Sequence, residues 1–263
     1  MKLGFIGCGN MATAIIKGII KNGKVKASDI IASDASAAAV EKAKELGIMT
    51  TTNNCEVVQS AEIVVFAVKP QYIGSVIAEI KDSYNSQQLI ISIVAGKTIA
   101  WYEEQFGKAI KLVRTMPNTP ALVGEGMTAA CTNANVSEEE LEEAVELLRC
   151  FSKVEVVGEN LMDVVGSVSG SSPAYVFMFI EAMADAAVSD GMPRAQAYEF
   201  AAQSVLGSAK LMLETKLHPG VLKDMVCSPG GTTIEAVRVL EEKGMRSAVM
   251  EAMKACTNKS KQL

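Results

Sequence analysis

The sequence predicts an α/β domain built on a mostly parallel sheet, followed by an all-helical domain. Three observations support this prediction. Short runs of β-branched residues alternate with alanine- and lysine-rich helical stretches, a glycine-rich turn follows the first of these runs, and the pattern becomes wholly helical after about Gly158. We therefore expect one domain over residues 1–158 and a second over residues 159–263.

Five apolar runs in the first domain are expected to be strands covered by helices on both faces of the sheet. Each run ends in a turn-forming or polar residue, and helical stretches such as SAAAVEKAKEL connect them. The five runs are LGFIG, IIASD, IVVFAV, QLIISIV and IKLVRTMP. Two further runs, GMTAACT and KVEVVG, are candidate strands on either side of a predicted helix whose Ser137 and Glu140 form a capping-box pattern.

The second domain is expected to consist of five helices. Ser172 predicts the N-cap of the first helix and Pro173 its first residue. This helix is apolar around most of its circumference, because only Glu181, Asp185 and Ser189 form a narrow polar stripe, and such a helix must be covered on nearly all sides. A small helical domain has little core of its own, so we expect a homodimer unit, or a larger homo-oligomer, to supply the cover.

A glycine-rich turn in the stretch LGFIGCGNMA predicts a dinucleotide site. Gly7, Gly9 and Ala12 follow a predicted strand and open a predicted helix. The glycines permit a tight turn and close approach of the backbone to a pyrophosphate, while the helix N-terminus supplies free N–H groups. This context predicts a Rossmann-type domain, whereas a simple strand-to-helix turn is the alternative.

The end of the second strand bears on the choice of nicotinamide cofactor. Asp34 lies where an acidic residue accepts hydrogen bonds from a ribose hydroxyl, which favours NADH. No basic residue follows before Lys42, so the usual clamp for a 2′-phosphate is missing, although Ser33 and Ser36 offer hydroxyls to a phosphate. The residues favour NADH weakly, and we expect NADPH or NADH as the cofactor.

Composition excludes several classes of function. The formal net charge is −5, which argues against nucleic acid or an anionic membrane surface as the main partner. No apolar run approaches a membrane span, and the N-terminus has no signal-peptide pattern. The six cysteines show no C-x-x-C spacing and the only histidine is His218, so we expect reduced thiols, a cytoplasmic location and no metal site.

Six stretches together resemble pyrroline-5-carboxylate reductase, the last enzyme of proline biosynthesis. They run in collinear order from Gly4 to the C-terminus. The stretches are GFIGCGNMA, NCEVVQSAEIVVFAVKPQ, RTMPNTPALVGEG, SVSGSSPAYVFMFIEAMADAAVSDGMPR, HPGVLKDMVCSPGGTTIEAVRVLE and GMRSAVMEA. The resemblance implies a Rossmann domain followed by a helical dimerisation domain, and NAD(P)H-dependent reduction of 1-pyrroline-5-carboxylate to L-proline.

The resemblance also implies the residues that hold the cofactor. The residues implied at the pyrophosphate are Ile6, Gly7, Cys8, Gly9, Asn10 and Met11. Asn54 corresponds to an asparagine near the adenosine half, and Met116, Pro117 and Asn118 would form a nearby wall. The residues implied around the ribose and nicotinamide are Val68, Lys69, Pro70, Ala95 and Gly96. This chain departs from the family pattern SGSGPAY because Ser172 replaces the second glycine.

The stretch VCSPGGTTIEA, at positions 226–236, is the candidate substrate site. A cyclic imine that carries a carboxylate needs a grip on that carboxylate, and a turn that opens a helix offers free N–H groups. The residues expected at the substrate are Ser228, Gly231, Thr232 and Thr233, and Thr233 is also the candidate for a hydrogen bond to the ring nitrogen. The alternative is a plain helix start, because Thr232 and Glu235 form a capping-box pattern themselves.

Two other functions remain open at this stage. A β-hydroxyacid-type dehydrogenase also joins a dinucleotide domain to a helical domain, but its G-x-x-x-N-x-x-K helix with a catalytic lysine is missing, because GSAKLML lacks the asparagine. A non-catalytic NAD(P)-binding sensor would keep GCGNMA but has no need of SPGGTT.

Overall fold

The computed structural model describes residues 1–262, which form two compact units. The first unit holds Met1–Ser171 together with the end of the chain from Cys256, and the second holds Ser172–Ala255. Each unit is described below by itself. The domain boundary expected between residues 158 and 159 stays a prediction.

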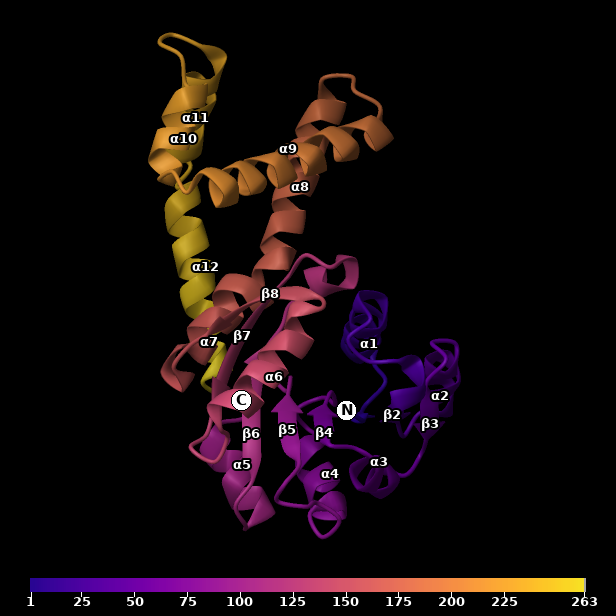
Figure 1. Cartoon of the computed structure of the whole chain (residues 1–263). Coiled ribbons are helices and arrows are strands. Elements are labelled where there is room, and N and C mark those ends of the chain that lie inside the picture. The colour runs from indigo at the N-terminus through magenta and orange to yellow at the C-terminus, as the bar shows by residue number, and fades with distance from the viewer. Residues whose placement is uncertain (263) are drawn as a thin grey trace. The chain divides into compact units, whose positions relative to one another are not determined.

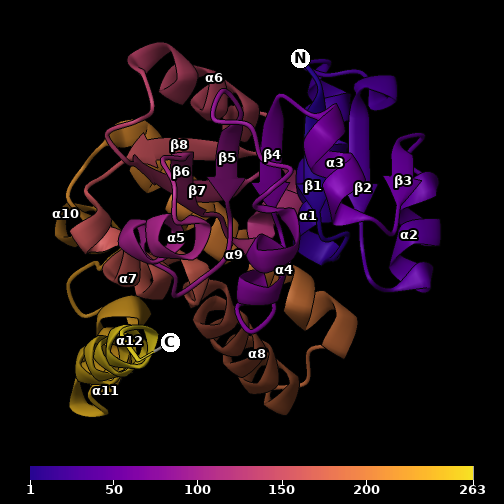
Figure 2. The same cartoon turned by 90° about the horizontal axis from the view of Figure 1, so that it is seen from below.

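The first unit is a Rossmann-like α/β domain, as the sequence predicts. Its described residues form a sheet in the order β3-β2-β1-β4-β5-β6-β7-β8, which Figure 2 shows from below. The strands are β1 Leu3–Ile6, β2 Ile30–Ser33, β3 Met49–Thr51, β4 Ile63–Phe66, β5 Leu89–Ser92, β6 Lys111–Met116, β7 Gly126–Thr132 and β8 Ser152–Val156. Neighbouring strands are parallel except for the antiparallel pair β6 and β7. The order β3-β2-β1-β4-β5-β6 of the first six strands is that of a dinucleotide-binding sheet, whose ligand lies where the order reverses between β1 and β4.

Helices cover both faces of this sheet (Figure 1). The helices of the first unit are α1 Asn10–Asn22, α2 Ala37–Lys44, α3 Asn54–Ser60, α4 Ile73–Ile80, α5 Ile99–Phe106, α6 Glu138–Arg149 and α7 Met162–Val165. The capping box predicted at the start of α6 is present, since Ser137 and Glu140 bond to each other's backbone N–H groups. A short π-helical segment, Gly166–Gly170, follows α7.

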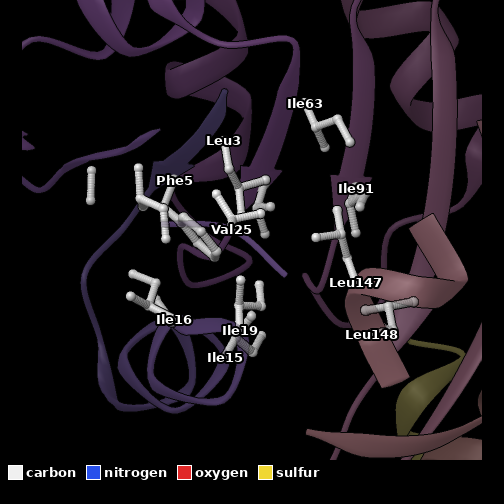
Figure 3. Packing of buried hydrophobic residues seen from close by; sticks show 14 of the residues in the cluster. Leu3, Phe5, Ile15, Ile16, Ile19, Val25, Ile63, Ile91, Leu147 and Leu148 are labelled. Atoms are coloured by element: carbon white, nitrogen blue, oxygen red, sulfur yellow. The ribbon is translucent and has the colours of Figure 1, made fainter. Parts of the chain in front are cut away.

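The alternation of side chains along each strand divides the core into two layers. Leu3 and Phe5 of β1 pack against α1 and α6 on one face, and Figure 3 shows α1 presenting Ile15 and Ile19 to them. Ile6 belongs to the layer on the other face, with α3, α4 and α5. Because successive strand residues point to opposite faces and both faces are buried, the strands read as unbroken apolar runs.

The second unit is all-helical, as predicted. Its helices are α8 Ser172–Ser189, α9 Arg194–Thr215, α10 Pro219–Val226, α11 Thr232–Glu242 and α12 Met245–Ser260, of which α12 ends in the first unit. Helices α8 and α9 pack against each other. Ser172, expected as an N-cap, is the first residue of α8 itself.

Candidate functional site

A cavity of about 630 Å³ lies in the first unit where several parallel strands end. Its lining comes from the turns that directly follow β1, β4, β5 and β6, and from the segments near Gly166–Ser171 and the end of α12. The lining residues are Gly9, Asn10, Met11, Ala67, Val68, Lys69, Ile93, Ala95, Met116, Pro117, Gly166, Gly170, Ser171, Cys256, Lys259 and Ser260. The carboxyl ends of parallel strands are where open α/β sheets bind their ligands.

The turn after β1 has the backbone geometry that a pyrophosphate requires. Gly7 adopts a φ of 107°, and a Cβ at this position would lie 2.5 Å from the carbonyl oxygen of Ala67, so only glycine fits. A Cβ at Gly9 would meet nothing within 4 Å, because Gly9 faces open space at the start of α1.

The N-terminus of α1 fits a dinucleotide phosphate. Gly9 is its N-cap, no side chain caps it, and its first turn holds no acidic residue. The free N–H groups and the positive end of the helix dipole therefore face an anion site without competition from the chain's own side chains. Asn10 and Met11, which the resemblance implies at the pyrophosphate, line the cavity at this point.

Asp34 lies directly after β2 and reaches the glycine turn. Its Oδ2 accepts a hydrogen bond from the backbone N–H of Cys8 at 2.8 Å, and its Oδ1 accepts one from the N–H of Ser36, also at 2.8 Å. Burial, with a smaller contribution from the Asp34 charge, raises the pKa of the Cys8 thiol to about 12. The side chains of Cys8 and Ile6 are buried. Their backbone is engaged as well, since the Cys8 N–H donates to Asp34 and the Ile6 carbonyl accepts the N–H of Ala67 at 2.9 Å.

Ser33, at the end of β2, and Asn54, at the start of α3, are joined by a hydrogen bond. The Ser33 hydroxyl is fully buried and donates to Oδ1 of Asn54 at 2.7 Å. The Nδ2 of Asn54 donates in turn to Oε2 of Glu79 at 2.8 Å. The hydroxyl of Ser33, which the sequence offered to a phosphate, is thus engaged inside the protein, where it holds Asn54 in place.

Some of the other residues predicted to hold the cofactor line the cavity, and the rest lie outside its lining. Val68, Lys69 and Ala95 line the cavity, whereas Pro70 does not, and Gly96 lines a separate cavity. Asn118 is buried and does not line it either. The Oδ1 of Asn118 accepts from the N–H of Met127 at 2.8 Å, and its Nδ2 donates to the Ser169 carbonyl at 3.1 Å. Asn118 therefore connects the wall at Met116 and Pro117 to the segment before α8.

The structure adds lining residues that the sequence did not reveal. The end of α12 is held in the first unit by hydrogen bonds from Thr257 to Ser167 at 2.9 Å and from Ser260 to Asp163 at 2.7 Å. It brings Cys256, Lys259 and Ser260 to the cavity. No motif marks these residues, because their position depends on contacts between segments about 90 residues apart. Lys69 and Lys259 are both cations, so the charged part of the lining suits an anionic ligand.

Arg114 is held away from the cavity by an acidic partner. Its Nη1 lies 2.8 Å from Oε1 of Glu159, and the same carboxylate oxygen accepts the N–H of Ile99 at the start of α5. The Arg114 side chain is almost fully buried. The pair stabilises the end of β6, and Arg114 does not line the cavity.

In the second unit, α11 begins without a capping box. Its N-cap is Gly231, no side chain caps it, and Glu235 pairs with Arg238 at 2.7 Å instead of reaching back to Thr232. The capping box expected from Thr232 and Glu235 is therefore absent. The first N–H groups of α11 keep their capacity to bind an anion.

The turn before α11 is shaped by its two glycines. Gly230 has a φ of 68°, in the left-handed region that favours glycine. A Cβ at Gly231 would collide with the Ser228 hydroxyl, so glycine lets that hydroxyl approach the helix start. Thr233 is half-buried in the first turn of α11, while Thr232 and Ser228 are exposed.

Within residues 1–262, no three His, Cys, Asp or Glu side chains are grouped as a metal site would need. In the same part of the chain, no helix has the length and apolar character needed to cross a membrane.

Comparison with known proteins identifies both parts of the chain. The family described as pyrroline-5-carboxylate reductase dimerisation matches residues 159–263, and the family described as NADP oxidoreductase coenzyme F420-dependent matches residues 2–96. A pyrroline-5-carboxylate reductase of Escherichia coli (strain K12) is 54% identical over the full chain and 98% of the relative. One from Methanosarcina acetivorans is 43% identical over the full chain and 97% of the relative.

Solved structures of pyrroline-5-carboxylate reductases also resemble this chain over its whole length. The pyrroline carboxylate reductase of Plasmodium falciparum, solved with NADP bound, superposes with a TM-score of 0.92 at 34% identity, covering 100% of this chain and 97% of that one. The pyrroline-5-carboxylate reductase of Coxiella burnetii superposes with a TM-score of 0.91 at 36% identity, covering 99% of this chain and 97% of that one. The chain therefore belongs to the pyrroline-5-carboxylate reductase family, whose members are NAD(P)H-dependent oxidoreductases that reduce a cyclic imine.

Proposed function

We propose that this chain reduces 1-pyrroline-5-carboxylate to L-proline by gripping the substrate carboxylate at the start of α11. The observation that supports this proposal most is the uncapped N-terminus of α11. A helix end with free N–H groups, a glycine turn and neighbouring hydroxyls suits a carboxylate. The contacts we assign to the carboxylate are the N–H group of Thr232 and the hydroxyls of Ser228, Thr232 and Thr233. Gly231, whose N–H donates to the Ser228 carbonyl at 3.0 Å, shapes the turn that presents them.

The dinucleotide is assigned to the cavity of the first unit. Gly7, Gly9 and the start of α1, with Asn10 and Met11, would hold the pyrophosphate. Val68, Lys69 and Ala95 would contact the nicotinamide half, with Met116 and Pro117 as the wall. The other residues expected there would act through the turns and loops that they shape; they are Ile6, Cys8, Pro70, Gly96 and Asn118.

The bound cofactor supplies a hydride, and the protein supplies position. A protonated imine is already a good electrophile, so the reaction needs little acid–base machinery, which fits a chain whose only histidine caps α10. We assign Thr233 to a hydrogen bond with the ring nitrogen. This bond would orient the imine and hold the proton that the nitrogen keeps in the product.

The helical unit is assigned to a homo-oligomer with a dimer as its unit. In the described residues of this unit, only Ala184, Ala197 and Ala201 are buried among the apolar side chains. Phe177 and Phe200 are 64% and 68% exposed in the single chain. Apolar surface of this extent needs cover, and a second copy of the same unit would supply it.

We also assign the protein to the cytoplasm. Its six cysteines are all free thiols, of which two are buried and four are partly buried. A reducing compartment keeps such thiols in this state.

A cofactor-oxidation assay tests the proposed function. With 1-pyrroline-5-carboxylate as substrate, the absorbance of the reduced nicotinamide at 340 nm should fall in step with the formation of proline. Simple 3-hydroxy acids with the oxidised cofactor should give no reaction. Turnover of 3-hydroxy acids without turnover of the imine would support a β-hydroxyacid-type dehydrogenase, and inactivity with both classes would support a non-catalytic sensor.

A further inference from the structure

The carboxylate of Asp34 is fixed beside the glycine turn. Strand β2 runs parallel to β1 with Ser33 opposite Ile6, so the residues that follow the two strands are neighbours. The backbone N–H groups of Cys8 and Ser36 hold one carboxylate oxygen each, at 2.8 Å. Asp34 is therefore half-buried in a defined orientation and is not a mobile surface charge.

Asp34 keeps free acceptor sites for a ligand. Each carboxylate oxygen has two lone pairs, and the structure uses one hydrogen bond on each. An acidic side chain at the end of the second strand of a dinucleotide-binding sheet accepts hydrogen bonds from the adenosine ribose hydroxyls. A ribose with both hydroxyls free satisfies these sites, whereas a 2′-phosphate brings a second negative charge to them.

The neighbouring groups do not compensate for that charge. The Ser33 hydroxyl is buried against Asn54, and the Ser36 hydroxyl accepts the N–H of Ala39 as the N-cap of α2. Residues 35–41 contain no lysine or arginine. Lys44, at the end of α2, pairs with Glu41 at 2.5 Å.

The negative charge of Asp34 also acts on the turn itself. It contributes to the raised pKa of the Cys8 thiol, although burial is the larger cause. A carboxylate at this place opposes a second anion by Coulomb repulsion, and the effect is strongest where the surroundings are partly desolvated.

We infer that Asp34 makes this chain prefer NADH over NADPH, by accepting hydrogen bonds from the adenosine ribose and repelling a 2′-phosphate. The inference rests on the proposed dinucleotide site.

Isothermal titration of the full-length protein with each reduced dinucleotide, in the absence of substrate, tests this inference. The unmodified protein should bind NADH at least roughly tenfold more tightly than NADPH. Asp34→Asn keeps an oxygen for the N–H of Cys8 but removes the charge. It should therefore strengthen NADPH binding and reduce the ratio of the NADH affinity to the NADPH affinity. Asp34→Ser with Ala35→Arg should reverse the ratio, because it adds a cation for the phosphate.

Asp29→Ser is the matched control. Asp29 lies just before β2, at the opposite end of the same strand, so the variant removes the same charge without touching the turn. It should leave both affinities unchanged. Equal or tighter binding of NADPH by the unmodified protein would overturn the inference, and so would an unchanged ratio in Asp34→Asn. Because binding is measured without substrate, a protein that prefers NADH but fails to reduce the imine would refute the proposed reaction and leave this inference standing.

Discussion

Thr233 is the side chain on which the proposed chemistry depends most. It is the second residue of α11 and is half-buried, and no side chain caps the N-terminus of this helix. Thr233→Ala should lower kcat/KM roughly 10- to 100-fold, as expected for the loss of a hydrogen bond of about 1.5–3 kcal/mol to a charged group. Steady-state kinetics checks this, and Thr233→Ser should recover most of the loss because it restores the hydroxyl. An unchanged kcat/KM in the alanine variant would remove Thr233 from the reaction.

Buried thiols make the stability of the first unit depend on alkaline pH. Burial raises the pKa of Cys8 to about 12 and that of Cys131 to about 11, and nearby carboxylates add to both shifts. In the unfolded chain a thiol ionises near pH 8.5. The stability contribution of each thiol is therefore complete below about pH 8.5 and is lost as the pH rises toward the folded pKa.

The free energy of unfolding in urea should accordingly fall as the pH rises from about 8.5 to about 11. Cys131→Ala removes one of the two groups, so its free energy of unfolding should fall less steeply over the same window, whatever the absolute cost of the substitution. Parallel pH profiles for the two proteins would contradict the assignment of the effect to Cys131.

Residue roles could be predicted only in part from the sequence. Asp34 and the glycines were found because their chemistry is tied to a local pattern. Ser33 was offered to a phosphate, but its hydroxyl is buried against Asn54, and nothing in the sequence gives the direction of a single hydroxyl. Lys259 was missed, since its place at the cavity depends on the C-terminal helix returning to the first unit.

At the scale of elements, the turn between β1 and α1 allows a matched pair of substitutions. Gly7→Ala should destabilise the protein by at least about 1–3 kcal/mol, because it combines a positive φ with a collision against the Ala67 carbonyl. Gly9→Ala should leave the thermal unfolding temperature almost unchanged, because its Cβ would point into open space.

The two variants should differ in cofactor binding as well. Gly9→Ala fills the space reserved for the pyrophosphate, so dinucleotide affinity measured by calorimetry should fall although the fold is intact. Full dinucleotide affinity in Gly9→Ala would show that the pyrophosphate lies elsewhere.

Elements with a strong periodic pattern were predicted well, and weak ones were not. The seven strands expected from apolar runs are all present, and α6 starts with the expected capping box. Strand β3 was missed because it has three residues at the sheet edge and only partial burial, too little for an apolar run. The π-helical segment Gly166–Gly170 was not predicted either, because no residue pattern in the sequence marks it.

At the scale of the whole molecule, the helical unit exposes large apolar side chains that the described residues of a single chain do not cover. Phe177→Glu on α8 should shift the protein to a smaller species in size-exclusion chromatography with light scattering, because a charge would be buried in the proposed interface. Met49→Glu is the control, since Met49 is also an exposed apolar residue but lies on edge strand β3 of the other unit. An unchanged molar mass in Phe177→Glu would place the interface elsewhere.

The central claim is that this chain transfers a hydride from a nicotinamide to the imine carbon of 1-pyrroline-5-carboxylate. The most direct measurement is mass spectrometry of the product after reaction with NADH that carries deuterium at both C4 positions. We expect L-proline with one deuterium, located at C5, and one NADH consumed per proline formed. Proline without deuterium, or consumption of NADH without formation of proline, would contradict it.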